Sequence, residues 1–331
     1  MKRVLLCVLS VLLLTACSTE KSMFKKAQIL EDKGEFEKAI QTYSAIIKKN
    51  PENYAALASR GLLFERLPAK DLQTARKNKE LAERDYLRAV GLNYFRPELL
   101  NNLGALYLDQ GRYEEAIFYL NQALAHRPQY FMALLNRAMA YSQTGDMTHA
   151  LIDFSRAEEL DDQNPLLYLN RGLAQYASGY YTAAVSDYTA MSALDPENPR
   201  AYLERGRAFI KMDYFQDALD DFHQAIALRP DYALPYYFSA ELLFSKGDTE
   251  QGIAYAEHAK KLAPNYAPVY EMLGDMLALE TPVEATQHYL AARRLNPSAA
   301  QRYQAKIRML NTENGRKKLV ADRFLNIGKR Q

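Results

Sequence analysis

The chain has no tryptophan, only two cysteines and no marked excess of either charge. Its 331 residues carry 42 basic and 40 acidic side chains, so it lacks the charge excess typical of nucleic-acid binding. Cys7 and Cys17 both lie in the first 17 residues, which leaves the rest of the chain without a thiol for disulfides or cysteine catalysis. Glycine and proline are few and regularly placed, as in a helical protein.

Signatures of catalysis are also missing from the sequence. There is no His-Glu-x-x-His pair, phosphate loop, Gly-x-Ser-x-Gly elbow or dinucleotide fingerprint. The five histidines are scattered without the spacing of metal ligands. We therefore expect no enzymatic activity, no metal and no cofactor. The alternative is an enzyme with an unfamiliar site, which would show clustered titratable groups in a closed pocket.

The N-terminus has the pattern of a processed signal segment. Lys2 and Arg3 precede an apolar run at 4–16, which is shorter than the roughly 20 residues needed to cross a bilayer. The run ends in Leu-Thr-Ala-Cys at 14–17, which resembles the lipobox of bacterial lipoproteins. The resemblance implies that residues 1–16 are removed, that Cys17 is lipidated and that 17–22 form a short linker. The alternative is an ordinary signal peptide with a chance cysteine.

The resemblance to lipoproteins also implies a location. Several acyl chains anchor a protein durably where one chain would be marginal. The residue after the cysteine is Ser18 rather than aspartate, which in Gram-negative lipoproteins favours sorting to the outer membrane. We therefore expect a lipid-anchored protein at the outer membrane, facing the periplasm.

Five alanines stand 34 residues apart, a fixed period that predicts stacked helical hairpins. With each alanine at position 20 of a unit, proline recurs at position 32, where it would stop a helix. Position 8 is always glycine or alanine, so positions 8 and 20 allow the two helices of a hairpin to approach closely. Large apolar residues recur at positions 4, 11, 17 and 24. The ladder alanines are Ala82, Ala116, Ala150, Ala184 and Ala218.

This pattern resembles the tetratricopeptide repeat family. The resemblance implies an all-α, right-handed superhelical solenoid of about eight hairpins over 23–299, with position 6 of each first helix facing an inner groove. Unit two carries nine extra residues around 68–77, and the last hairpin is one residue short. We count eight units: 20–53, 54–96, 97–130, 131–164, 165–198, 199–232, 233–266 and 267–299.

Residues 300–331 form a separate basic element. Between 301 and 331 there are nine basic and two acidic residues. Apolar residues interspersed with these charges predict a C-terminal capping helix, or two short ones, that closes the stack. The alternative is a tail that contacts anionic lipid or a partner.

Arginine at position 7 occurs only in units that have aspartate at position 23. Because those positions lie opposite each other across a hairpin, we predict ion pairs within each unit. The alternative is a basic stripe for an acidic partner. The residues concerned are Arg60, Arg137, Arg171 and Arg205, with Asp85, Asp153, Asp187 and Asp221.

Asparagine holds position 6 in three successive units, at Asn102, Asn136 and Asn170. This series resembles the ladder with which some tetratricopeptide superhelices bind a peptide backbone, and a carboxamide can both donate to and accept from extended backbone. Adjacent apolar residues at positions 2, 5 and 9 suit a peptide ligand. The alternative is a solvated inner face. The apolar candidates are Met132, Leu135, Met139, Leu166, Leu169 and Leu173.

Further along, position 9 becomes Arg207, Glu241 and Asp275, so the groove changes from apolar to charged. The expected function is a membrane-anchored scaffold that binds envelope proteins or extended peptides in its groove. By overall resemblance it recruits periplasmic proteases or peptidoglycan hydrolases. The alternative is a pilotin-like factor for an outer-membrane secretin or type IV pilus. Imperfect terminal units often pair end to end, so self-association is a further expectation.

Overall fold

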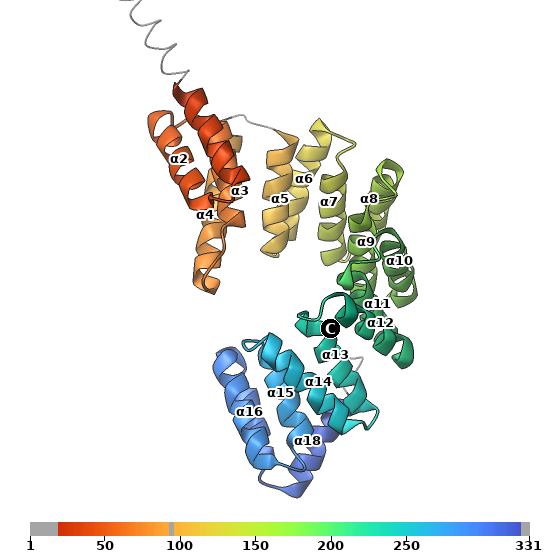
Figure 1. Cartoon of the computed structure of the whole chain (residues 1–331). Coiled ribbons are helices and arrows are strands. Elements are labelled where there is room, and N and C mark those ends of the chain that lie inside the picture. The colour runs from red at the N-terminus through yellow and green to blue at the C-terminus, as the bar shows by residue number, and fades with distance from the viewer. Residues whose placement is uncertain (1–18, 93–95, 326–331) are drawn as a thin grey trace, which may run out of the picture. The chain divides into compact units, whose positions relative to one another are not determined.

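The computed structural model describes residues 19–92 and 96–325, and all regular structure in these ranges is helical. It divides into two compact units, which we call the N-terminal half, ending at Asp161, and the C-terminal half, beginning at Asp162. Within each half, consecutive helices pack in antiparallel pairs (Figure 1). The predicted all-α fold of paired helices is therefore confirmed.

In the N-terminal half, a first helix is described over 19–32, and its Phe24 contacts Tyr43 of the next helix with ring centroids 5.2 Å apart. Residues 19–22, which we had assigned to a linker, are therefore helical. The longest helix is the second helix of unit two, where the sequence carries its insertion. The helices that follow the first are α2 (Phe36–Lys49), α3 (Tyr54–Arg66), α4 (Leu72–Gly91), α5 (Pro97–Asp109), α6 (Tyr113–His126), α7 (Phe131–Gln143) and α8 (Met147–Leu160).

The C-terminal half contains four hairpins followed by two further helices. The odd-numbered helix of each hairpin comes first, and we call these first helices the A helices. The elements are α9 (Pro165–Ala177), α10 (Tyr181–Leu194), α11 (Pro199–Lys211), α12 (Phe215–Leu228), α13 (Ala233–Ser245), α14 (Thr249–Leu262), α15 (Ala267–Leu277), α16 (Pro282–Leu295), the 3-10 turn η1 (Pro297–Ala299), α17 (Ala300–Met309) and α18 (Glu313–Leu325).

The core of each hairpin is built from the small residues of the repeat. The five ladder alanines are fully buried. At position 8, a glycine leaves room for the ring or branched side chain at position 24: a Cβ on Gly172 would lie 2.6 Å from Cε1 of Tyr188, and one on Gly206 would lie 2.6 Å from Cε1 of Phe222. The small residue at position 8 therefore leaves the space that the large side chain at position 24 fills.

Most hairpin turns are closed by a glycine in the left-handed backbone region. Gly145 and Gly179 both have φ +82°, a conformation that costs other L-residues about 1–2 kcal/mol. In unit six the same place is taken by Asp213 at φ 62°, and aspartate is one of the few residues that tolerate it. These turns fix the antiparallel return of the second helix.

The basic C-terminal segment does more than close the stack. As expected, α17 packs against α16, the last helix of the final hairpin. The next helix, α18, contacts α13 and α15, the A helices of units seven and eight (Figure 1). Leu319 of α18 is 3% exposed, and Val320 packs against the cores of both hairpins.

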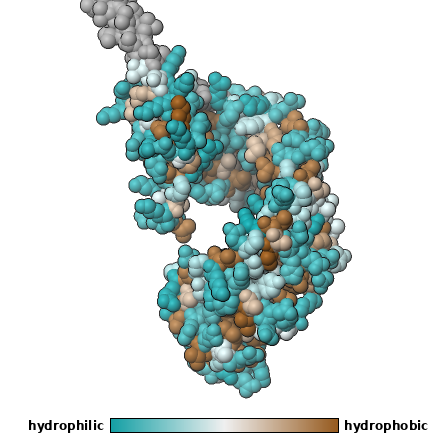
Figure 2. All heavy atoms as spheres, viewed as in Figure 1, coloured by the Kyte–Doolittle hydropathy of each residue, from teal (hydrophilic) through white to brown (hydrophobic). Residues whose placement is uncertain are grey.

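The surface seen in Figure 2 is mostly hydrophilic, with apolar residues interspersed among polar ones. None of the helices in the described ranges is both long and apolar enough to cross a membrane.

Candidate functional site

The arginines at position 7 are ion-paired to the aspartates at position 23 of the same hairpin. In each pair the closest N–O distance is 2.7–2.8 Å, and the aspartate side chain is at most 8% exposed. The prediction is confirmed, so these arginines belong to the scaffold and not to a ligand-binding stripe. The pairs are Arg60–Asp85, Arg137–Asp153, Arg171–Asp187 and Arg205–Asp221.

Three of these guanidinium groups also form a hydrogen bond with the preceding unit. Nη1 of Arg60 donates to Ser44 Oγ at 2.9 Å, and Nη1 of Arg137 donates to Asn121 Oδ1 at 2.7 Å. In the C-terminal half, Nη1 of Arg205 donates to Thr189 Oγ1 at 3.2 Å. Each acceptor stands at position 25 of its unit. One side chain therefore ties a hairpin together and joins it to its neighbour.

The predicted groove residues of the N-terminal half lie on two neighbouring A helices, α5 and α7. Asn102 and Asn136 are both half-buried. Asn136 Nδ2 donates to Oδ1 of Asn101 at 2.9 Å, so it pairs with position 5 of the preceding unit and not with Asn102. Met132 is 38% exposed and Met139 is half-buried. These side chains offer amide and thioether groups to a ligand, and their role in binding stays a prediction.

The remaining predicted groove residues, Leu166, Asn170 and Leu173, lie on α9 in the C-terminal half. Asn170 Nδ2 donates to the carbonyl oxygen of Leu166, one turn earlier, at 2.8 Å. Leu166 is 43% exposed, whereas Leu173 is partly buried against neighbouring core residues. A ladder that includes all three asparagines likewise stays a prediction.

Position 5 does not line the groove in the way we expected. Leu135 is 1% exposed and Leu169 is 5% exposed. Leu169 belongs to a core cluster with Tyr188 and Ala201, because position 5 faces the next helix in the stack. Both leucines are therefore core residues and cannot contact a ligand.

A pocket of about 720 Å³ lies along the A helices of the C-terminal half. At one end, Arg207 on α11 lies between two rings, with its guanidinium carbon 5.1 Å from the centroid of Tyr176 and 5.4 Å from that of Phe238. Its Nη1 also contacts Glu204 at 2.5 Å. Burial and the neighbouring Arg207 charge lower the pKa of Lys211, one turn further along α11. This end of the pocket is aromatic and cationic.

The other end of the pocket is formed by three carboxylates, which we call the carboxylate cluster: Glu241 on α13, with Glu271 and Asp275 on α15. They stand at positions 5 and 9 of units seven and eight. They are 8%, 3% and 0% exposed. Buried carboxylates are stable in ionised form only when cations or hydrogen-bond donors compensate them. The cluster therefore requires positive partners.

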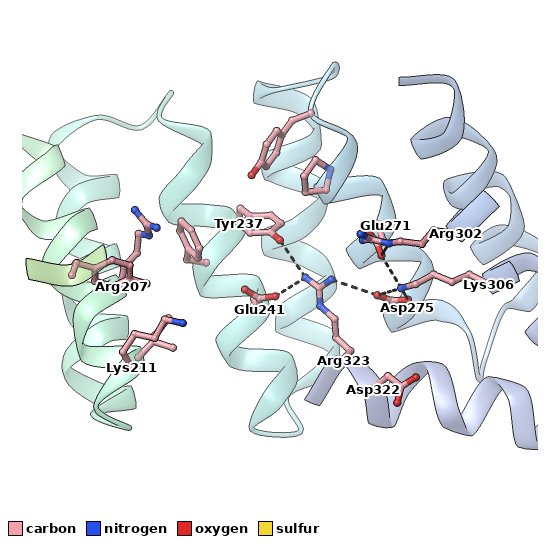
Figure 3. Close-up of a pocket in the computed structure, with 15 residues that line it drawn as sticks. Arg207, Lys211, Tyr237, Glu241, Glu271, Asp275, Arg302, Lys306, Asp322 and Arg323 are labelled. Atoms are coloured by element: carbon pink, nitrogen blue, oxygen red, sulfur yellow. Dashed lines mark hydrogen bonds and ion pairs between the residues drawn. The ribbon is translucent and has the colours of Figure 1, made fainter. Parts of the chain in front are cut away.

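Cations from α17 and α18 pair with all three members of the carboxylate cluster (Figure 3). Arg302 pairs with Glu271. Lys306 Nζ lies 2.9 Å from Glu271 Oε1 and 2.6 Å from Asp275 Oδ1. Asp275 Oδ1 also accepts a hydrogen bond of 2.6 Å from the hydroxyl of Tyr289. The basic tail thus neutralises the inner side of the last two hairpins.

Arg323, near the end of α18, is the most deeply placed of these cations. Its side chain is 0% exposed and lies between α13 and α15 (Figure 3). Nη2 is 2.7 Å from Glu241 Oε1 and 3.4 Å from the Tyr237 hydroxyl, while Nη1 is 3.4 Å from Asp275 Oδ2. Burial alone would lower the pKa of Arg323, but Glu241, Tyr237 and Asp275 raise it, so the group stays charged.

The electrostatics of the cluster are clearest at Glu271. Burial alone would raise the pKa of this carboxyl, but hydrogen bonds and charge from Arg302 and Lys306 hold it at about 2. The carboxylate is therefore ionised at any pH near neutrality. The pairing of α17 with α15 depends on that charge.

The sequence named part of this site and missed its most important contact. The charged residues at position 9, Arg207, Glu241 and Asp275, and the basic composition of the tail are both evident in the sequence. The sequence pattern does not indicate that the tail folds back onto those acidic residues. Opposite charge in the two segments was the available signal, but Arg323 and Glu241 are 82 residues apart and no periodicity links them.

Two further expectations concern lipidation and metal binding. Cys17, the predicted lipidation site, lies outside the described residues. Among the residues that are described, no group of three or more His, Cys, Asp or Glu side chains is arranged to hold a metal ion.

Known proteins share this architecture. Human tetratricopeptide repeat protein 13 is 26% identical over 140 residues, which cover 42% of this chain but only 16% of that protein. A tetratricopeptide repeat protein from Parabacteroides merdae is 20% identical, with a TM-score of 0.63 over 77% of this chain and 98% of its own. Pseudomonas aeruginosa pilF is 21% identical, with a TM-score of 0.53 over 63% of this chain and 97% of its own.

Family profiles described as tetratricopeptide repeat match residues 24–77, 97–130, 133–164, 169–211 and 206–267. These segments cover more than half of the chain and include hairpins from both halves. With the buried alanine ladder and the paired helices, they lead to one conclusion: the chain belongs to the tetratricopeptide repeat family.

Proposed function

We propose that the chain is a non-enzymatic scaffold that binds proteins or extended peptides along its A helices, with no part for nucleic acid. The observation that carries this proposal is the chemistry of α7, where Asn136 and two methionines lie at positions 2, 6 and 9, which we predict to face a ligand. Met132 is 38% exposed beside them. A carboxamide can pair with peptide backbone whatever its sequence, and thioethers adapt to varied side chains. Family membership supports the same function.

We further propose that this scaffold works at the cell envelope. The lipobox-like sequence at 14–17 supports acylation of Cys17, and Ser18 supports an outer-membrane position facing the periplasm. The partners would then be envelope proteins, such as periplasmic proteases or peptidoglycan hydrolases, which the scaffold holds close to the membrane.

Affinity capture from solubilised membranes tests the binding surface. The double variant Met132→Ala/Asn136→Ala is expected to recover partners of the native chain at least about tenfold less well, because two adjacent ligand-facing groups are lost. Gln122→Ala, on the second helix of the preceding hairpin, is the matched control and should recover them normally. Equal recovery by all three chains would place binding elsewhere.

The pilotin-like alternative stays a prediction, because no described residue favours it over the scaffold. It predicts a different phenotype when the gene is deleted. Deletion of the gene would mislocalise an outer-membrane secretin, whereas loss of a recruiting scaffold would leave the secretin in place and release soluble enzymes from the membrane.

A further inference from the structure

The inner side of units seven and eight already holds a ligand, and that ligand is the chain's own last helix. α18 contacts α13 and α15, and Arg323 enters between them (Figure 3). The residues that receive it, Tyr237, Glu241 and Asp275, stand at positions 5 and 9 of their A helices. Position 9 is one of the places where we expected a partner to bind. The contact therefore resembles recognition more than simple closure of the stack.

The charges show what kind of ligand this surface requires. Glu241, Glu271 and Asp275 contribute three buried negative charges. Three cations of the tail, Arg302, Lys306 and Arg323, pair with these charges. Removing one member of a buried ion pair is strongly destabilising, because the other charge is left uncompensated. Without a basic ligand, the carboxylate cluster would be unfavourable.

The docked helix is amphipathic in the way such a ligand must be. Leu319, Val320 and Arg323 face the hairpins, with Leu319 3% exposed and Arg323 2% exposed. Lys317 and Lys318 on the same helix are exposed. Recognition therefore combines an apolar contact with one deeply inserted guanidinium, the arrangement that dominates affinity at many interfaces.

We propose that the A-helix surface of α13 and α15 is a receptor for basic amphipathic helices, that α18 occupies it in cis, and that a partner's arginine-bearing helix binds there by displacing α18. The existence of an external partner rests on the proposed scaffold function. Docking in cis does not depend on it. The pocket beside Arg323, lined by Tyr176, Arg207 and Phe238, gives a longer ligand room to extend beyond the site that α18 fills.

Because α18 is tethered to its site, we expect it to occupy the site when no partner is present. A ligand joined to its site by a short connection acts at an effective concentration of the order of mM. Only residues 310–312 separate α17 from α18. An external helix must therefore bind more tightly than α18, or be delivered by a second contact elsewhere on the scaffold.

The experiment measures binding of a labelled peptide with the sequence of residues 313–325 to full-length proteins. Arg323→Glu should release α18 and bind the peptide at least about tenfold more tightly than the native chain, whose site is occupied. Lys318→Glu makes the same charge change on an exposed side chain and should behave like the native chain. Adding Glu241→Gln to Arg323→Glu should remove the gained binding, as should glutamine at the arginine position of the peptide.

Hydrogen exchange provides the second readout. In Arg323→Glu the amides of α18 should exchange at least about tenfold faster than in the native chain, while those of α13 stay protected. If that variant unfolds the last hairpins, Arg323→Gln, which removes the charge at similar size, replaces it. Equal peptide binding by native chain and variant, or none by either, overturns the proposal. So does a released tail that binds only anionic vesicles. None of these outcomes affects the test of Met132 and Asn136.

Discussion

An arginine and an aspartate sixteen residues apart form the most regular polar contact of this chain. In unit two the spacing is 25, because the nine-residue insertion lies between them, yet Arg60 and Asp85 still meet at 2.7 Å. The insertion therefore lengthens the hairpin without changing the register of its two helices. At the scale of single residues, charge correlation between positions predicted a contact that periodicity alone did not.

A double-mutant cycle on Arg171 and Asp187 tests the energetic value of this contact. With Asp187 7% exposed and the guanidinium 16% exposed, we expect a coupling free energy of about 1.5–3 kcal/mol from urea denaturation followed by far-UV circular dichroism. The control is the exposed pair Lys317–Glu313, for which we expect less than about 0.5 kcal/mol. A buried pair with no more coupling than the exposed one would contradict the structural role.

At the scale of elements, α17 is held to α15 by charge, and its stability should depend on pH. The folded-state pKa of Glu271 is about 2, below its ordinary value of 4.5. A depressed carboxyl pKa stabilises the folded state above the unfolded-state pKa, and the stabilisation is lost as the pH falls toward the folded-state value. The difference corresponds to about 3 kcal/mol at neutral pH.

Thermal unfolding of the native chain and of Glu271→Gln, measured from pH 6 down to about pH 2, checks this expectation. The native chain should be the more stable at pH 6, and the two melting temperatures should converge as Glu271 becomes protonated. Acid destabilisation from other groups affects both proteins equally. Parallel profiles across the whole range would mean that Arg302 and Lys306 do not depend on the Glu271 charge.

Much of the hairpin array could be predicted from the sequence, because the same pattern of residues recurs in successive units. Gly172 and Tyr188 illustrate the limit: the pattern indicated that position 8 must be small, but only the structure shows the ring that fills the space. Leu135 and Leu169 were misassigned because position 5 faces a neighbouring helix. The placement of α18 could not be predicted, since a contact that occurs once between two distant segments leaves no repeating pattern in the sequence.

At the scale of the whole molecule, the anchor is the expectation that most affects function. Cys17→Ala is expected to leave soluble or unprocessed protein, because acylation requires the thiol. Cys7→Ala is the matched control, since that cysteine lies in the segment that we expect to be removed. Membrane fractionation and intact mass distinguish the cases. Recovery of Cys17→Ala in the membrane at the native mass would refute the lipid anchor.

The contact of three position-7 arginines with the preceding unit bears on how this array can be rearranged. Arg60, Arg137 and Arg205 each donate to a hydrogen-bond acceptor at position 25 of the unit before them, here Ser44, Asn121 and Thr189. A unit moved behind one that lacks this acceptor would keep its own fold but leave a guanidinium bond unmade. Gene duplication or engineered shuffling would therefore preserve these contacts only where the two units moved together.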